Sequence, residues 1–193
     1  MDLHDDLGST LTRISVMTEV AQRRVEHDPP GARESLVRIG DAARDLIESL
    51  GDIVWTVDPK HGDLQNVIRR IVQFGQELCE GRGIAFETEL LASFDSVRLT
   101  PDQRRDIYLV FKEGINNLVR HSGATRARFR VQARGGTALL ELLDDGSGIR
   151  EQPGGTGHGL ASLRERGERV GVRFSLGSAN GEGTRIALEI KTA

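Results

Sequence analysis

Apolar residues recur every three or four positions along the first part of the chain, a spacing that predicts helices with one buried face. The first stripe consists of Leu3, Leu7, Leu11, Ile14, Met17, Ala21 and Val25. The sequence HDPPG at residues 27–31 then interrupts the pattern, because Pro29 and Pro30 cannot continue a helix. A second stripe consists of Leu36, Ile39, Ala43, Leu46, Leu50, Ile53 or Val54, and Val57, and the sequence DPKHGD ends it. We therefore expect two antiparallel helices joined by a short turn.

This helical hairpin has a single apolar seam and no further core of its own. Two copies would bury their seams in a four-helix bundle, so we predict a homodimer through residues 1–58, with Trp55 near its base. The alternative is a hairpin that packs against the rest of its own chain. In either case we assign residues 1–60 to the hairpin domain and residues 61–193 to a second domain.

The second domain has a mixed pattern of helices and strands. Thr100, Pro101 and Gln103 form a strong helix start, with an N-cap, a proline at the first position and a capping-box residue. We expect helices at residues 64–83, 100–121 and 160–170, and strands at residues 84–90, 126–133, 137–144, 172–178 and 184–190. The fold class is therefore α+β, with a largely antiparallel sheet that has helices on one face.

Composition excludes several classes of partner. The net charge of −3 gives no reason to expect nucleic acid. The single cysteine, Cys79, cannot form an internal disulfide and lacks metal-ligand spacing, which suits a reducing cytoplasm. No apolar run approaches the ~20 residues of a membrane-spanning helix. We expect no direct membrane contact for this chain, and leave open an anchor on a longer parent protein.

Polar side chains with a common chemistry follow one face of the helix expected at 100–121. Glu113 and Asn117 are one turn apart, and Arg120 and His121 follow one turn later. Carboxylate and amide oxygens are suitable ligands for Mg²⁺, and basic side chains are suitable for phosphate. This face could also be ordinary solvated surface.

The chain has two glycine-rich segments, one directly after an expected strand and one directly before an expected helix. Asp144 ends a strand and is followed by Gly146 and Gly148, so its carboxylate could accept a hydrogen bond from an exocyclic amine beside a tight turn. Gly157 and Gly159 open directly into the next helix, whose first N–H groups favour phosphate. Each glycine cluster alone is consistent with an ordinary loop, and the order of the segments is the more informative feature.

The order of these segments resembles the ATP-binding domain of the GHKL superfamily, which includes sensor histidine kinases and gyrase. EGINNLVRHSGAT looks like the N box, DDGSGI like the first glycine box and GHGLASLRERGERVG like the second. KEGINNLVRHSGA is especially similar to bacterial two-component sensor kinases whose regulators carry helix-turn-helix output domains. DLHDDLGSTLTRI resembles the phosphoacceptor box of that subfamily, and DIVWTVDP resembles the end of its second dimerisation helix.

The resemblance implies a fold, a reaction and a set of site residues. The fold is a hairpin that forms a dimeric four-helix bundle, followed by a GHKL-type α/β sandwich. The reaction is autophosphorylation of His4 by ATP, with Asp5 assisting, and transfer of the phosphate to the receiver domain of a response regulator. By the same resemblance, Glu113 and Asn117 hold Mg²⁺, and the other ATP-binding residues are Arg120, His121, Asp144, Gly146, Gly148, Gly157, Gly159, Leu160 and Thr184.

The chain departs from this subfamily at two places. Ser9 stands where the family usually has a glutamine that positions water for dephosphorylating the regulator, so we expect phosphatase activity that is weak or that works differently. His4 lies in the first helical turn, whereas related proteins usually have another turn or more of basic sequence before this histidine. We therefore expect this core to belong to a longer sensor. The alternatives are a GHKL ATPase or anti-sigma-type protein kinase, for which Glu113 would activate water, and a dimeric scaffold with a vestigial nucleotide site.

Overall fold

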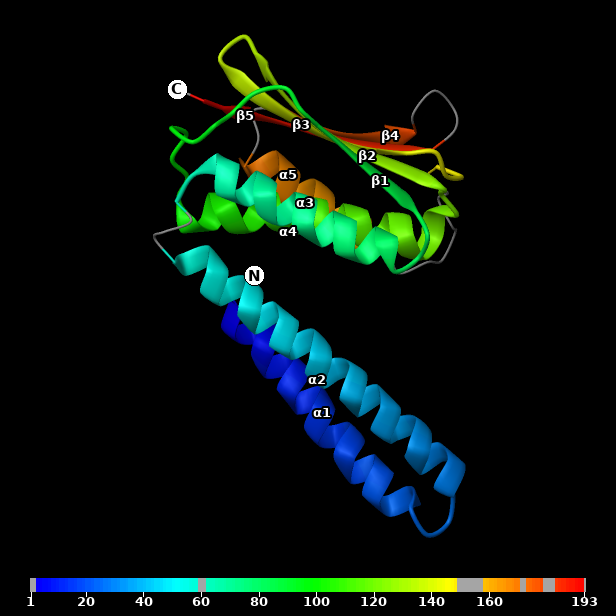
Figure 1. Cartoon of the computed structure of the whole chain (residues 1–193). Coiled ribbons are helices and arrows are strands. Elements are labelled where there is room, and N and C mark those ends of the chain that lie inside the picture. Colours follow the sequence, from blue (N-terminus) through cyan, green and yellow to red (C-terminus); the bar gives the residue numbers. More distant parts are fainter. Residues whose placement is uncertain (1–2, 59–61, 149–157, 171–172, 179–182, 193) are drawn as a thin grey trace. The chain divides into compact units, whose positions relative to one another are not determined.

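The computed structural model describes residues 3–58, 62–148, 158–170, 173–178 and 183–192 of the chain (Figure 1). The chain divides into two compact units, Met1–Val57 and Asp58–Ala193. Among the described residues, no helix combines the length and apolar character needed to cross a membrane.

The first unit is the predicted helical hairpin, made of α1 (Leu3–Arg24) and α2 (Pro29–Val57). Pro29 and Pro30 lie in the first turn of α2, where a missing N–H costs no helical hydrogen bond. The side chain of Asp28 accepts a hydrogen bond from the N–H of Gly31 (3.0 Å), and so caps the new helix. The prolines therefore end one helix and begin the next.

The fully buried apolar residues of the two helices are small, while several large ones are exposed. Ala21, Ala32 and Ala42 are buried. Several apolar side chains are exposed in the single chain, namely Leu11, Val16, Val25, Leu36, Val37, Ile47, Leu50 and Val54. Residues of the predicted seam such as Leu11, Leu36 and Leu50 are thus left uncovered.

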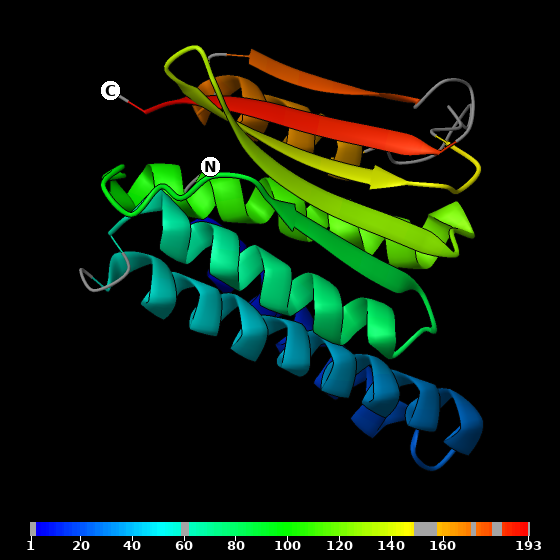
Figure 2. The same ribbon diagram turned by 45° about the horizontal axis from the view of Figure 1, so that its top comes forward.

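The second unit is a sheet covered on one face by helices, as predicted (Figures 1 and 2). The helical elements are α3 (Leu64–Glu80), α4 (Pro101–Asn117), the π-helical turn η2 (Leu118–Ser122) and α5 (His158–Val170). The strands are β1 (Ala85–Leu90), β2 (Arg126–Arg134), β3 (Thr137–Asp144), β4 (Arg173–Ser178) and β5 (Thr184–Lys191). Their order in the sheet is β1-β2-β3-β5-β4.

Three details differ from the sequence-based expectation. β1 pairs with β2 in parallel, while the other pairs in the sheet are antiparallel. The helix expected to reach His121 is α-helical only to Asn117 and continues as the π-helical turn η2. α5 begins at His158, two residues before the expected start.

The core lies between the helices and the sheet. Ile107, Phe111 and Ile115 of α4 and Leu118 of η2 are buried, as the apolar pattern predicts. The Phe111 ring meets Phe129 of β2 edge to face, with 5.3 Å between ring centroids. Thr100 forms the predicted capping box with Gln103, which fixes where α4 begins. Cys79 is fully buried, and burial raises the pKa of its thiol to about 11, so it stays protonated.

Candidate functional site

The ends of several elements meet at one end of the sheet. β3 is antiparallel to both β2 and β5, so the end of β3 lies beside the starts of β2 and β5. α4 leads through η2 directly into the start of β2, so its C-terminal residues reach the same end. This topology gathers Asn117, Asp144 and Thr184 from distant parts of the sequence.

Glu113 and Asn117 form a polar pair on the last turns of α4. The Nδ2 group of Asn117 donates to Oε1 of Glu113 at 3.1 Å, and both side chains are half-buried. Because the amide uses its nitrogen for this bond, its Oδ1 oxygen remains an available ligand. The donor set is therefore one of hard oxygens, which fits Mg²⁺.

Gly114 holds this part of α4 close to the sheet. A Cβ atom at Gly114 would lie 3.1 Å from Cδ2 of Leu142 on β3 and would overlap Cδ1 of Ile186 on β5. Leu142 precedes Asp144 by two residues, and Ile186 follows Thr184 by two. The helix that carries Glu113 and Asn117 thus packs directly on the two strands that carry Asp144 and Thr184. The only sequence signal for this role was a glycine inside an otherwise amphipathic helix.

Asp144 connects the end of β3 with the start of β5. Its Oδ1 atom accepts hydrogen bonds from the backbone N–H groups of Gly146 (2.8 Å) and Thr184 (3.2 Å). The N–H of Gly183 donates to the carbonyl of Gly146 at 2.6 Å. Gly183 has φ +74°, and a Cβ atom there would overlap the Asp144 carbonyl, so this close approach requires glycine. These bonds orient the Asp144 carboxylate by backbone contacts from both sides.

The turn after Asp144 also contacts the end of η2. The N–H of Ser147 donates to the carbonyl of Ser122 at 2.8 Å, and a Cβ atom at Gly146 would lie 2.6 Å from the Ser122 side chain. Gly148 has φ +72°, a left-handed conformation that favours glycine. The predicted glycines Gly146 and Gly148 therefore have steric reasons to be glycine.

Asp145 is a positioning residue that the sequence interpretation missed. Its Oδ1 atom accepts from the N–H groups of Thr125 (2.8 Å) and Arg126 (2.9 Å), and Oδ2 accepts from the Thr125 hydroxyl (2.8 Å). The hydrogen bond from the Arg126 backbone, followed by those from Thr125, holds the pKa of Asp145 below its usual range. The second aspartate of DDGSG was the available signal. Asp145 links the start of β2 to the loop that follows Asp144.

The remaining predicted residues of the ATP site lie on η2, at the start of α5 or outside the described residues. Arg120 and His121 are exposed on η2, a π-helical turn of the kind often found at functional sites. Gly159 and Leu160 lie in the first turn of α5, with Leu160 exposed. Gly157 lies outside the described residues.

The predicted phosphoacceptor pair belongs to the other unit. His4 and Asp5 lie in the first turn of α1, and their side chains are outside the described part of the chain. The structure therefore describes the two halves of the predicted site separately.

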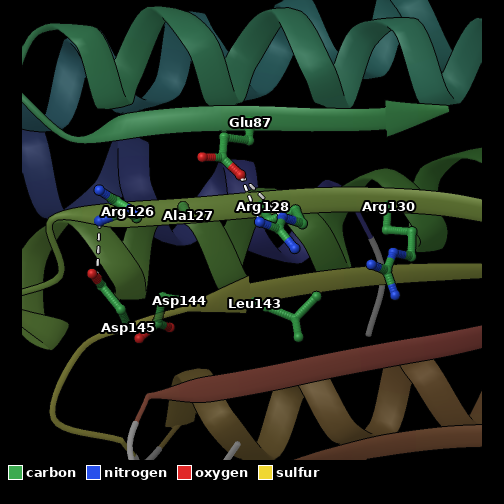
Figure 3. A pocket seen from close by; sticks show the side chains of 8 residues that line it. All are labelled: Glu87, Arg126, Ala127, Arg128, Arg130, Leu143, Asp144 and Asp145. Carbon is green, nitrogen blue, oxygen red and sulfur yellow. Dashed lines mark hydrogen bonds and ion pairs between the residues drawn. The ribbon is translucent and has the colours of Figure 1, made fainter.

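An open pocket over β1, β2 and β3 is lined mostly by charged residues, and Asp144 and Asp145 of the candidate site are among them (Figure 3). Arg128 pairs with Glu87 at 2.8 Å, and Arg130 pairs with Glu89 at 2.6 Å. These arginines alternate along β2 with buried residues such as Phe129, so they occupy the sheet face without helices. The charges are largely paired with one another, which indicates a structural ladder across the strands.

No three His, Cys, Asp or Glu side chains of the described residues converge on a metal site made by protein alone. Mg²⁺ in nucleotide sites is usually held by one or two protein side chains together with the phosphates. The Glu113–Asn117 pair fits such a shared site.

Two family models match consecutive parts of the chain. Residues 1–62 match the family described as histidine kinase, and residues 102–193 match the family described as histidine kinase-, DNA gyrase B- and HSP90-like ATPase. Together they cover most of the chain and span both units.

Curated proteins and solved structures agree with these matches. The signal transduction histidine-protein kinase/phosphatase UhpB of Salmonella typhimurium is 27% identical over 190 residues, which is 98% of this chain and 37% of that protein. The sensor histidine kinase DesK of Bacillus subtilis is 27% identical over 98% of this chain and 49% of that protein. The chain thus spans between a third and a half of the length of these relatives. The structure of Acinetobacter baumannii histidine kinase AdeS has a similar fold, with a TM-score of 0.61, 17% identity and coverage of 93% of this chain and 97% of that one.

Proposed function

Because the chain belongs to the sensor histidine kinases, we propose that it transfers the γ-phosphate of ATP to His4 and then to an aspartate of a response regulator. The observation that carries this proposal is the convergence of the Glu113–Asn117 pair with Asp144 and Thr184 at one end of the sheet. This cluster offers one set of groups for the adenine base and another for metal-bound phosphates. The first helix of the same protein carries His4.

ATP binding follows from the chemistry of the cluster. The Asp144 carboxylate, oriented through Oδ1 by Gly146 and Thr184, accepts a hydrogen bond from the exocyclic amine of adenine. Asn117 and Glu113 would hold Mg²⁺ together with the phosphates, and the bound ion would supply positive charge that offsets the charge developing on the phosphoryl group. Arg120, His121 and the first turn of α5, with Gly159 and Leu160, provide further contacts for the phosphate end.

The reaction is an in-line phosphoryl transfer. A ring nitrogen of His4 attacks the γ-phosphorus, so an N–P bond forms while the P–O bond to ADP breaks. Asp5 accepts the proton from the other ring nitrogen or stabilises the positive charge that develops there. The phosphate then passes to an aspartate carboxylate of the receiver domain, which regenerates neutral His4. We expect this chemistry to take place in the cytoplasm.

We further propose that the hairpin dimerises. Some exposed apolar residues recur at helical spacing, and a second hairpin could cover them in a four-helix bundle: Leu11 and Val25 of α1, and Leu36, Ile47, Leu50 and Val54 of α2. Burial of these side chains stabilises association because it removes apolar surface from water.

Dephosphorylation of the regulator is the second activity to consider, because UhpB is described as both kinase and phosphatase. Ser9 of this chain lies on α1, one residue beyond the first turn after His4, where the family pattern has glutamine. A serine hydroxyl is too short to position water as an amide does, so we propose weak phosphatase activity. Ser9→Gln should then accelerate loss of phosphate from the phosphorylated regulator.

The test is incubation with γ-labelled ATP and Mg²⁺, with His4→Gln as the comparison. The proposal predicts an acid-labile, base-stable label in the wild type that is absent in the variant. Hydrolysis of ATP at equal rates in both proteins, without any label, would instead favour the ATPase reading in which Glu113 activates water.

A further inference from the structure

Asp106, near the start of α4, pairs with two arginines of α5. Its Oδ2 atom lies 2.9 Å from Nε of Arg169, and its Oδ1 atom accepts from Nη2 of Arg169 at 3.3 Å. Nη1 of Arg166 lies 3.6 Å from the same Oδ1. Asp106 is buried, with 8% of its surface exposed, so this is a fixed contact between the two helices. None of the predicted site residues belongs to this cluster.

α5 is fixed on two further sides. Leu163, near the middle of the helix, is 1% exposed and packs in the core. A Cβ atom at Gly167 would overlap the ring of Phe174, so α5 lies directly against β4 at this point. By contrast, the side chain of Leu160 in the first turn is 36% exposed. The contacts of Leu163, Gly167 and Arg169 therefore fix the middle and the C-terminal part of α5.

The helix directions connect this contact to the proposed ATP site. Asp106 is near the start of α4 and Arg169 is near the end of α5, so the helices pack antiparallel. Asn117 follows Asp106 by eleven residues, and His158 precedes Arg169 by eleven. Each separation of eleven residues corresponds to about 16 Å along a helix. The Asp106 contact therefore sets the register in which the end of α4 faces the start of α5.

We propose that Asp106, through Arg166 and Arg169, is a positioning residue that sets the first turn of α5 against Asn117 and so determines the affinity for the phosphate groups of ATP. This inference rests on the proposed function, because it assumes that ATP binds at this end of the sheet. Asp106 does not touch the nucleotide in this proposal. It acts through the helix register, and Asp144 on β3 remains unaffected.

This role differs measurably from a purely structural one. A contact that only stabilises the fold would lower the melting temperature of a variant without changing the affinity of the remaining folded protein. A contact that sets helix register changes the binding of phosphates but not of adenosine, since the base is recognised from the sheet by Asp144. The ratio of the adenosine Kd to the ATP Kd therefore separates the two roles.

The experiment measures the Kd values of Mg·ATP, Mg·ADP and adenosine by calorimetry, well below the melting temperature of each protein. The variants are Asp106→Asn and Arg169→Ala, with Arg169→Lys as the conservative rescue. Arg169 is half-exposed, so its variants test the proposal even where Asp106→Asn folds poorly. Glu189→Gln, which removes the Arg134–Glu189 pair, is the matched ion-pair control.

We expect Asp106→Asn and Arg169→Ala to weaken ATP and ADP about tenfold, in line with the cost of misplacing binding groups. Adenosine binding should be unchanged, Arg169→Lys should recover part of the loss, and Glu189→Gln should behave like the wild type. Equal loss for adenosine and ATP, or a lower melting temperature with unchanged Kd values, would overturn this inference alone. A wild type that binds no ATP would overturn the proposed function, and this inference with it.

Discussion

Gly114 of α4 and Ile186 of β5 approach so closely that a methyl group on Gly114 would overlap the Cδ1 atom of Ile186. This contact lies one residue from Glu113 and two residues from Thr184. The distance between α4, which carries the proposed metal ligands, and β5, which carries Thr184, therefore depends on the absence of a side chain at residue 114.

Gly114→Ala should destabilise the second unit. Overpacking of a tight core contact costs about 1–3 kcal/mol, more than the helix propensity gained by alanine. Thermal unfolding of the variant should occur several degrees below that of the wild type, by the usual relation of stability to melting temperature. Ile186→Val removes the Cδ1 atom, so the double variant should recover part of the loss. A Gly114→Ala protein as stable as the wild type would contradict the close packing.

Asn117→Ala should weaken Mg²⁺-dependent ATP binding strongly. The amide oxygen is one of few protein ligands in the proposed site, and loss of such a ligand should weaken Mg·ATP by at least about tenfold. Titration of each protein with ATP, in the presence and in the absence of Mg²⁺, measures the effect. Asn116→Ala, on the neighbouring residue of the same helix, is the control and should bind normally. Equal affinities for the Asn117 and Asn116 variants would remove Asn117 from the metal site.

Asp145 should make the second unit lose stability as the pH falls through the acidic range. The pKa of its carboxyl is lowered in the folded protein by hydrogen bonds from Arg126 and Thr125. A group with a lowered folded-state pKa contributes stability above its unfolded pKa, about 3.9 for aspartate, and loses it as pH falls through the folded value. Unfolding curves between pH 6 and pH 2 should therefore fall more steeply for the wild type than for Asp145→Asn. Parallel curves would show that these bonds contribute no pH-dependent stability.

Leu11→Asp should convert the proposed dimer into a monomer. A carboxylate placed in a buried apolar seam would lack a partner, and its desolvation would oppose association. Sedimentation measurements over a range of protein concentrations report the change. Arg13→Asp is the control, because residues two apart on a helix point to different faces. A dimer that tolerates Leu11→Asp would place the interface elsewhere.

The sequence was informative wherever a local pattern determined the structure. The apolar stripes predicted the hairpin, and the buried face of α4 agreed with its expected members Ile107, Phe111 and Ile115. The capping residues Thr100 and Gln103 gave the start of α4 correctly. These features depend on residues close together in sequence, so periodicity and capping chemistry suffice to identify them.

Features that depend on distant residues were not predictable in this way. The parallel pairing of β1 with β2 results from a connection that contains all of α4, and no local pattern records it. The contacts of Gly114, Asp145 and Asp106 join segments 19 to 72 residues apart, so they appear only once the chain has folded. The order of motifs supplied the residues of the proposed ATP site, whereas the groups that orient them had to be read from the structure.

The most direct test of the central claim is to locate the phosphate on the chain. The protein is incubated with Mg·ATP, digested at neutral to basic pH, and the peptide that contains His4 is examined for phosphohistidine by mass spectrometry. The account predicts phosphate on His4 in the wild type and none on that peptide in Asn117→Ala. Phosphate on another residue, or an unmodified His4 peptide in a wild type that binds and hydrolyses ATP, would contradict it.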